Sequence, residues 1–172
     1  MNPTDLLQRI QDNKGILYKI SNSYCRNAGD REDLMQEMVY QLWRSGQRFD
    51  ETQKFSTWMY RIALNVAISF YRKASRSGVT VALDAEAHFD DGRSNEVLEE
   101  RIEVLTQFVR ELNELDKALM ILYLEERPYR EIAEILGISE TNVATKLSRI
   151  KGRLRQKFTT DRIGSGPQNL KL

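Results

Sequence analysis

The stretch YREIAEILGISETNVATKLSRIKGRLRQKF, residues 129–158, has the pattern of two helices joined by a tight turn. Gly137 stands where the chain must leave the first helix, usually with a positive φ angle that glycine adopts without steric penalty. Ser139 follows as a good N-cap for the second helix. The spacing therefore predicts a helix-turn-helix over residues 129–157.

Apolar residues at helical spacing give each of these two helices one inward face. Ala133 is small enough for the second helix to cross the first one closely. The inward residues are Ile132, Ala133 and Leu136 on the first helix, and Val143, Leu147, Ile150 and Leu154 on the second. The opposite face of the second helix is left for solvent or for a ligand.

That outer face carries hydrogen-bonding side chains near the start of the helix and cations farther along. After Ser139, its residues are Thr141, Asn142, Thr145, Lys146, Arg149 and Arg153. A recognition helix in the major groove of DNA divides its work in this way, between base edges and phosphates. We therefore predict that these residues bind duplex DNA. The alternative is a solvated helical hairpin, which is the usual meaning of a basic helix face alone.

The net charge of +1 over 172 residues is an average of unlike segments. Residues 1–76 contain 12 Lys/Arg against 8 Asp/Glu, residues 77–116 contain 3 against 11, and residues 117–172 contain 11 against 6. Two basic segments thus flank an acidic one. This asymmetry favours basic units that bind a polyanion, joined by a segment that the polyanion repels.

The composition points away from catalysis. Cys25 and His88 are each the single residue of their type, so neither a cysteine-based metal cluster nor an ordered catalytic triad is expected. Glycine-rich phosphate-binding loops do not occur in the sequence. We expect no catalytic residue, metal or cofactor. With no apolar run long enough for a bilayer and no secretory signal, we expect a cytoplasmic protein without membrane insertion.

Helical periodicity extends over most of the chain and predicts an all-α fold. Helices are expected over about 5–27, with a possible interruption near Gly15, and over about 30–45, 55–73, 98–112 and 115–122. The pattern lapses at 74–94. We predict two small helical domains joined by a flexible acidic linker, with bounds 1–74, 75–95 and 96–160, and a disordered tail at 161–172.

Two patterns in the first domain have a chemical interpretation. Asp33, Gln36, Glu37 and Tyr40 share one helix face at spacing i, i+3, i+4 and i+7, which by itself is typical of a solvated face. A break between helices at 45–54 brings cations close to aromatic residues. Proteins that open a nucleic-acid duplex need both, since aromatic rings stack on unpaired bases and cations bind the backbone. The residues concerned are Arg48, Phe49 and Lys54, followed by Trp58, Tyr60 and Arg61. Trp58 fits the apolar stripe and is expected in the core.

Three strings carry a resemblance to bacterial RNA polymerase sigma factors. They are DREDLMQE at 30–37, FSTWMYRIALNVA at 55–67 and YREIAEILGISETNV at 129–143. Their order and spacing resemble the compact extracytoplasmic-function (ECF) group of the principal sigma superfamily. Members keep sigma domain 2, which opens the −10 promoter element, and sigma domain 4, which reads the −35 element, and replace the domain between them by a linker.

The resemblance implies a role for each string. Asp33, Gln36 and Glu37 would dock on the clamp helices of the largest subunit of core RNA polymerase. The loop 45–54 and Asn65 would capture a flipped base of the nontemplate strand, and Tyr71, Arg72 and Lys73 would contact the duplex just upstream. Residues 139–153 would read the −35 element of promoter DNA. Asn142 and Ala144 depart from the residues that many members have, so −35 specificity is not transferred.

The implied function is promoter-specific initiation, with an anti-sigma protein as a further expected partner. The acidic linker would thread through polymerase as a nucleic-acid mimic. The alternative is a dimeric helix-turn-helix repressor or activator that acts without polymerase, for which Asp33, Gln36 and Glu37 would have no role.

Overall fold

The computed structural model describes residues 2–76 and 96–164, and every element in those ranges is helical. The first domain comprises α1 (Pro3–Asp12), α2 (Lys14–Tyr24), α3 (Ala28–Ser45), the short 3-10 helix η1 (Gly46–Arg48) and α4 (Phe55–Arg76). The second comprises α5 (Glu96–Glu111), α6 (Glu114–Leu124), α7 (Tyr129–Leu136) and α8 (Glu140–Gly164). The predicted all-α class is confirmed. The predicted acidic linker and His88 lie outside the described residues, apart from the last residues of α4.

Asparagine side chains cap the N-termini of three of these helices. The side-chain oxygens of Asn2, Asn27 and Asn113 accept hydrogen bonds from the backbone N–H of Thr4 (3.0 Å), Asp30 (2.7 Å) and Asp116 (2.9 Å). Each bond satisfies an N–H group that lacks a partner within its helix. Asn13 separates α1 from α2, so the expected interruption near Gly15 is confirmed two residues earlier in the chain.

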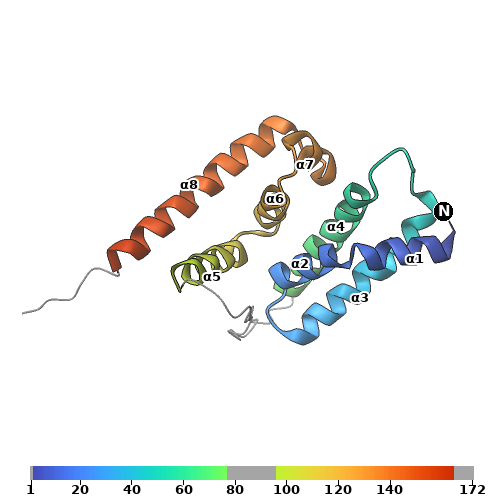
Figure 1. Cartoon of the computed structure of the whole chain (residues 1–172), viewed down its shortest axis with the longest axis horizontal. Helices are drawn as coiled ribbons and strands as arrows, with labels where there is room; N and C mark the ends of the chain where they lie inside the picture. Colours follow the sequence, from blue (N-terminus) through green and yellow to red (C-terminus); the bar gives the residue numbers. More distant parts are fainter. Residues whose placement is uncertain (1, 77–95, 165–172) are drawn as a thin grey trace, which may run out of the picture.

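The first domain is a bundle in which α2, α3 and α4 pack on one another and α1 lies against α3 (Figure 1). Its fully buried residues come from all three long helices: Leu17, Ile20, Leu34, Met38, Leu42, Met59 and Ala63. Gly46 is packed so closely under α1 that a Cβ atom there would lie 2.1 Å from Leu6 Cδ2. This contact fixes the start of the 45–54 loop against the bundle.

In the second domain, α5, α6 and α7 all pack along the same side of α8 (Figure 1). Ile132, Val143, Leu147 and Ile150 are buried here, as the helical spacing predicts. Leu136 and Leu154 are only partly buried, and Ile135 is the additional buried residue of α7. α8 reaches Gly164, so the helix continues into the region predicted as a tail.

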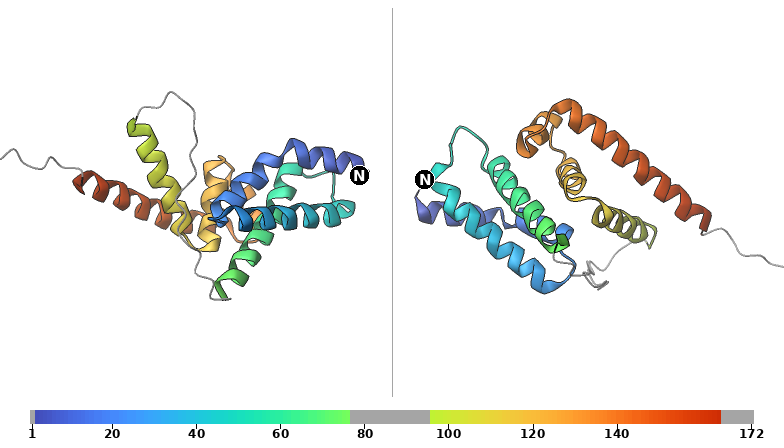
Figure 2. Two further views of the ribbon diagram at one scale, coloured as in Figure 1. Left: turned by 90° about the horizontal axis from the view of Figure 1, so that it is seen from below. Right: turned by 180° about the vertical axis from the view of Figure 1, so that it is seen from behind.

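The two domains lie side by side, as both views of Figure 2 also show. α4 contacts α6 and α7, while α2 contacts α5 and α6. The buried apolar residues of both domains form one contiguous cluster. The described chain therefore has a closed arrangement with a shared core, and the first domain's α4 faces the second domain.

Candidate nucleic-acid and polymerase-binding surfaces

The turn between α7 and α8 has the geometry of a helix-turn-helix. Gly137 has φ 68° and ψ 33°, and the N–H of Ile138 donates to the carbonyl of Ala133 at 3.1 Å. Gly137 thus ends α7 in the left-handed backbone conformation, which glycine adopts without a steric penalty because it has no Cβ atom. Ser139 Oγ accepts from the N–H of Asn142 at 3.1 Å, so the predicted N-cap is confirmed.

The helix α8 exposes four of its predicted DNA-binding residues. These are Thr141, Asn142, Thr145 and Arg149, and Ser139 is exposed just before them. They occupy the first turns of α8 and the turn that follows. Hydrogen-bonding side chains thus lie where a helix N-terminus would enter a groove, and Arg149 lies one turn beyond Thr145.

Two cations of the same face are engaged by neighbouring helices, which the helical spacing of α8 alone does not reveal. Lys146 is half-buried, with Nζ 3.7 Å from Asp116 Oδ1 of α6. The guanidinium of Arg153 lies 5.8 Å from the ring centre of Phe108 on α5. Both cations thus contact a neighbouring helix, although Arg153 is exposed as predicted and only Lys146 is half-buried.

The 45–54 loop does not present its aromatic residue to solvent. Phe49 is only 9% exposed, and its ring packs 5.5 Å from that of Phe55 and 5.1 Å from that of Trp58, centre to centre. Trp58 is in the core, as predicted. Phe49 is buried as well. Its backbone lies in the connection between η1 and α4, but its ring packs against the two aromatic rings of α4. Arg48 and Lys54 remain exposed on either side.

The turn within this loop is closed by an aspartate. Asp50 Oδ1 accepts from the N–H of Thr52 at 2.9 Å, and this backbone hydrogen bond lowers the pKa of the Asp50 carboxyl below its usual value. Side-chain hydrogen bonding of this type favours a turn over a helix. The loop that bears Arg48 and Lys54 therefore has a defined local shape.

On α4, three of the predicted DNA-binding residues share one helix face. Asn65 is exposed, and Arg61 and Arg72 stand one turn before it and about two turns after it. Positions i, i+4 and i+11 of an α-helix lie nearly in line. Tyr71 is half-buried and Lys73 is exposed. The structure thus brings Arg61, Asn65 and Arg72 together on one face of α4, with Tyr71 and Lys73 on either side of that face. The other predicted residues, Arg48, Phe49 and Lys54, lie before α4.

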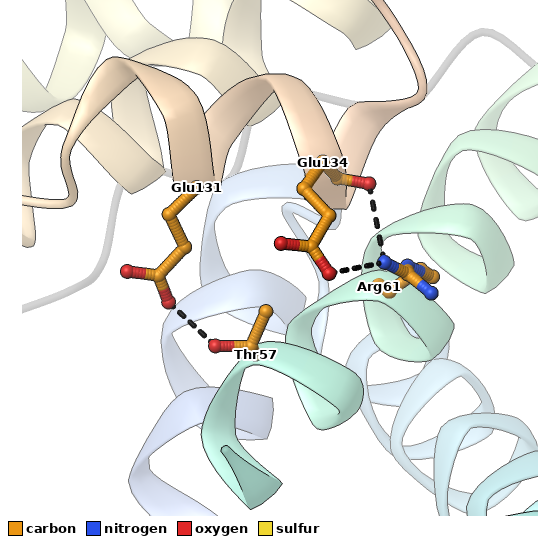
Figure 3. A network of polar contacts seen from close by, with 4 residues as sticks. All are labelled: Thr57, Arg61, Glu131 and Glu134. Carbon is orange, nitrogen blue, oxygen red and sulfur yellow. Dashed lines mark hydrogen bonds and ion pairs between the residues drawn. The ribbon is translucent and has the colours of Figure 1, made fainter. Parts of the chain in front are cut away.

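The second domain contacts this face of α4 with acidic side chains that the sequence analysis did not single out (Figure 3). Thr57 Oγ1 donates to Glu131 Oε1 of α7 at 2.6 Å, and the Arg61 guanidinium donates to Glu134 Oε1 at 3.0 Å. Farther along α4, Arg72 Nε lies 2.8 Å from Glu114 Oε1 of α6. The available sequence signal was the presence of Glu131 and Glu134 on the first helix of an otherwise basic helix-turn-helix.

Lys117 of α6 is buried in the same interface. Its side chain is 2% exposed, and its Nζ lies 5.2 Å and 5.1 Å from the ring centres of Tyr24 and Tyr71. Burial, assisted by the charge of Arg26, lowers the pKa of the Lys117 amine to about 8. The sequence signal is one cation within the apolar run of α6.

A second set of polar contacts joins α2 to the second domain. The hydroxyl of Tyr24 donates to the carbonyl of Glu114 at 2.5 Å, and burial raises the pKa of this phenol. Lys19 of α2 forms an ion pair with Glu125 at the end of α6. α2 therefore makes polar contacts with both ends of α6, at Glu114 and at Glu125.

On the far side of the first domain, α3 exposes the predicted polymerase-binding residues Asp33, Gln36 and Glu37. Beside them lies a shallow apolar groove, which the sequence analysis did not recognise. It is lined by Leu7, Met35, Gln36, Val39, Tyr40 and Trp43. Tyr40 and Trp43 are 52% and 51% exposed, so an acidic edge and an exposed apolar strip run along the same helix.

The described residues contain no group of three or more His, Cys, Asp or Glu side chains that could hold a metal ion. Cys25 is buried, and this burial raises the pKa of its thiol to about 12, which makes it a poor nucleophile. None of the helices at 2–76 and 96–164 combines the length and apolar character needed to cross a membrane.

Comparisons with known proteins match both domains. Residues 9–77 match the family model of sigma-70 region 2, and residues 102–154 match that of sigma-70 region 4. The chain is 30% identical over 160 residues to the ECF RNA polymerase sigma factor SigW of Bacillus subtilis, covering 84% of each chain. It is 27% identical over 164 residues to the sigma factor SigV of the same organism, covering 91% of this chain and 92% of the relative.

Solved structures show the same fold. The sigma factor RpoE in complex with the anti-sigma factor NepR from Bartonella quintana superposes with a TM-score of 0.72 at 20% identity, covering 91% of this chain and 98% of that one. CnrH in complex with the cytosolic domain of CnrY gives a TM-score of 0.66 at 19% identity, over 93% and 91%.

A helix-turn-helix domain joined to a helical bundle, with both parts matching sigma-70 regions, defines a promoter-specificity subunit of bacterial RNA polymerase rather than a stand-alone regulator. The chain belongs to the sigma-70 family of sigma factors and is an ECF sigma factor. A homodimeric repressor that acts without polymerase is not favoured, because it leaves the region 2 match unexplained.

Proposed function

We propose that this ECF sigma factor divides promoter recognition between its two domains, with α8 reading the −35 duplex and α4 with the 45–54 loop opening the −10 element. The observation that carries the proposal is the pair of exposed polar faces, one beginning at Ser139 on α8 and one centred on Asn65 on α4. Phosphodiester chemistry belongs to the core enzyme, and we expect the sigma factor to act where that enzyme is, in the cytoplasm.

At the −35 element, the first turns of α8 enter the major groove. Thr141, Asn142 and Thr145 are short enough to contact base edges without lifting the helix from the groove. Arg149 is the main cation of this face, because Lys146 and Arg153 already have partners on α6 and α5. Those two contribute to phosphate contacts after their side chains turn away from these partners.

At the −10 element, opening is driven by binding energy for an extruded base and an exposed strand. Asn65 offers a donor and an acceptor to a base edge, while Arg48 and Lys54 bind the backbone of the open strand from the loop. Arg61, Arg72 and Lys73 face the phosphates upstream, with Tyr71 between them. Phe49 supports the loop from within the core, unlike an exposed stacking platform.

Core polymerase binds at α3. A pair of clamp helices lays an apolar strip into the groove lined by Met35, Val39 and Trp43, and its basic side chains face Asp33 and Glu37. Gln36 stands at the border between the two and hydrogen-bonds either class of partner. An anti-sigma protein is a further partner that we propose, since one of the solved neighbours is a complex with such a protein.

The test of the division of labour uses a promoter of this sigma factor in two versions, intact and with a scrambled −35 element. Arg149→Ala is expected to reduce transcription from the intact promoter by about 5- to 100-fold, the effect of one lost base contact. On the scrambled promoter the variant and the parent protein are expected to transcribe equally. A similar loss on both promoters would contradict −35 reading by α8.

The matched variant Asn65→Ala addresses the other domain. It is expected to leave closed-complex formation intact and to lower permanganate reactivity of the −10 thymines at least tenfold. Unchanged reactivity would contradict the role of Asn65 in strand opening.

A further inference from the structure

Lys146, one of the cations that the proposed function assigns to −35 DNA, lies on the border between the exposed and the buried face of α8. Val143 and Ile150, three residues before it and four after it, are buried, whereas Arg149 is exposed. The side chain of Lys146 is 36% exposed, and its Nζ lies 3.7 Å from Oδ1 of Asp116 on α6. A carboxylate of a neighbouring helix therefore lies beside a cation that DNA would use.

Asp116 is fixed in place by the N-terminal cap of α6. Its backbone N–H donates to Asn113 Oδ1 at 2.9 Å, and its Oδ2 accepts from Asn113 Nδ2, also at 2.9 Å. Two side chains that bond each other in this reciprocal way hold each other's orientation, as in a capping box. The Asp116 side chain is only 13% exposed, so it would lose this cap if it turned toward solvent.

The other carboxylate oxygen of Asp116 depends on Lys146. This Oδ1 is buried and accepts no hydrogen bond from any residue that the structure describes. The ammonium of Lys146 compensates its charge from a distance that is too long for a hydrogen bond. A buried carboxylate that loses its counter-charge is unfavourable. Moving Lys146 to a phosphate therefore carries a free-energy cost that Asp116 imposes.

Two other cations of α8 contact aromatic rings instead. Lys151 Nζ lies 5.0 Å from the ring centre of Tyr123, and the guanidinium of Arg153 lies 5.8 Å from that of Phe108. A ring attracts a cation without adding a net negative charge, so these two side chains still attract a phosphate. Asp116 differs because it places a full negative charge next to its cation.

We propose that Asp116 is a positioning residue that holds Lys146 back from the DNA backbone and thereby sets the affinity and the salt dependence of −35 binding. The inference rests on the proposed function, since it requires that α8 binds duplex DNA. Phosphates are the same at every sequence, so restraining one phosphate contact lowers the affinity for any duplex. Base contacts by residues such as Asn142 and Arg149 then provide a larger part of the binding free energy.

The size of the effect follows from the release of counterions. Each phosphate that a protein neutralises adds about 0.9 to the slope of log K against log salt concentration, so one contact changes the affinity about eightfold at about 0.1 M salt. Releasing Lys146 from Asp116 should add one such contact. Its signature is a steeper salt dependence together with tighter binding.

The experiment is a double-mutant cycle on the full chain, read by fluorescence anisotropy of a labelled duplex that bears the −35 motif of a mapped promoter. Asp116→Asn keeps the size of the side chain and an oxygen for the Asn113 cap, but removes the charge that faces Lys146. We expect this variant to bind about fivefold to tenfold more tightly than the parent protein at about 0.1 M KCl, with a slope steeper by about 0.9. In the Lys146→Ala background, the same substitution is expected to change the affinity less than about twofold.

Glu111→Gln is the matched control. It removes the same charge and frees Lys157, whose Nζ lies 2.7 Å from Glu111 Oε2. Lys157 lies about 16 Å farther along α8 than Lys146, which is beyond the distance of about 10 Å over which charges act at 0.1 M salt. We expect the affinity and the slope of this control to equal those of the parent. A duplex with a scrambled motif should show the same gain for Asp116→Asn, because its phosphates are unchanged.

The restraint of Lys146 would be overturned by a slope equal to that of the parent, by a gain that persists when Lys146 is replaced by alanine, or by no binding of Asp116→Asn at the lowest salt. Weaker binding with a shallower slope would overturn it too, since Asp116 would then direct Lys146 toward DNA. A smaller folded fraction would lower the apparent affinity without steepening the slope, so it cannot imitate the expected result.

Failure of the proposed function has a different signature. In that case Arg149→Ala and Lys146→Ala bind both duplexes as the parent does, and the restraint is overturned with it because Lys146 has no phosphate to bind. A motif preference that Arg149→Ala reduces, with no effect of Asp116→Asn, would leave the proposed function standing and overturn the restraint alone.

Discussion

Lys117 is the one fully buried charged side chain in the described parts of the chain, and it lies between aromatic rings of the other domain. A buried amine is stabilised there by the faces of the tyrosine rings, which attract a cation. Its lowered pKa shows that this attraction does not fully replace water. The interface thus contains a buried charge whose effect on the free energy of unfolding depends on pH.

Stability should therefore rise with pH above neutrality. The pKa of Lys117 is about 8 in the folded chain, against 10.5 for a solvated lysine, so the unfolded chain binds more protons between these values and the free energy of unfolding increases with pH. The raised thiol pKa of Cys25 opposes this trend above about pH 9. Urea unfolding from pH 7 to 9 should show the increase, and Lys117→Met should remove it. An equal slope in both proteins would contradict this account.

The groups that face this amine are known from the packing around it. They are Cys25, Arg26, Arg110 and Glu114, besides the two tyrosine rings. Glu114 has its pKa lowered, first by the hydrogen bond from Arg72, so it stays ionised throughout the pH range of the experiment. The predicted change near pH 8 is therefore assigned to Lys117.

Gly46 is expected to tolerate no side chain. Its Cβ position lies 2.1 Å from a buried methyl of Leu6, so Gly46→Ala should lower the free energy of unfolding by about 1–3 kcal/mol, the usual cost of overpacking. Gly15→Ala is the control, since open space surrounds that Cβ and alanine favours a helix by about 1 kcal/mol. Thermal unfolding should move in opposite directions for the two variants. A neutral Gly46→Ala would show that Leu6 gives way.

At the scale of helices, local patterns predicted what local interactions determine. Gly137 and Ser139 located the helix-turn-helix because a positive φ and an N-cap are properties of a few adjacent residues. The burial of Phe49 was not predicted, because it depends on the packing of its ring against Phe55 and Trp58, which local spacing does not encode. The partner of Lys146, on α6, escaped prediction for the same reason.

α3 shows the same contrast between a feature that local spacing predicts and one that depends on packing between helices. Its acidic face could be predicted from helical spacing, whereas the apolar groove beside it also needs Leu7 of α1. If the groove binds the polymerase clamp, Trp43→Ala should weaken binding to core polymerase by about 30-fold, as expected for the loss of a central aromatic contact. Tyr18→Ala removes an equally exposed aromatic ring from α2 and should leave binding unchanged. Equal effects of both substitutions in a core-binding titration would contradict the assignment.

At the scale of the whole molecule, two domains that the sequence analysis treated as independent share one core. The charge pattern predicted basic units, but it concealed that Glu131 and Glu134 of the second unit contact Thr57 and Arg61 of the first. Pairings over such sequence distances depend on how the domains dock, and no periodicity within either domain encodes that. The closed arrangement was therefore not predictable, although both of its parts were.

The most direct test of the central claim is run-off transcription of fragmented genomic DNA by core RNA polymerase, with and without this chain, followed by sequencing of the transcript 5′ ends. We predict start sites that appear only with the chain and share two motifs at a constant spacing, one near −35 and one near −10. Arg149→Ala should lose the sites that depend most on the upstream motif. No chain-dependent start sites, or sites that share a single duplex motif, would contradict bipartite promoter reading.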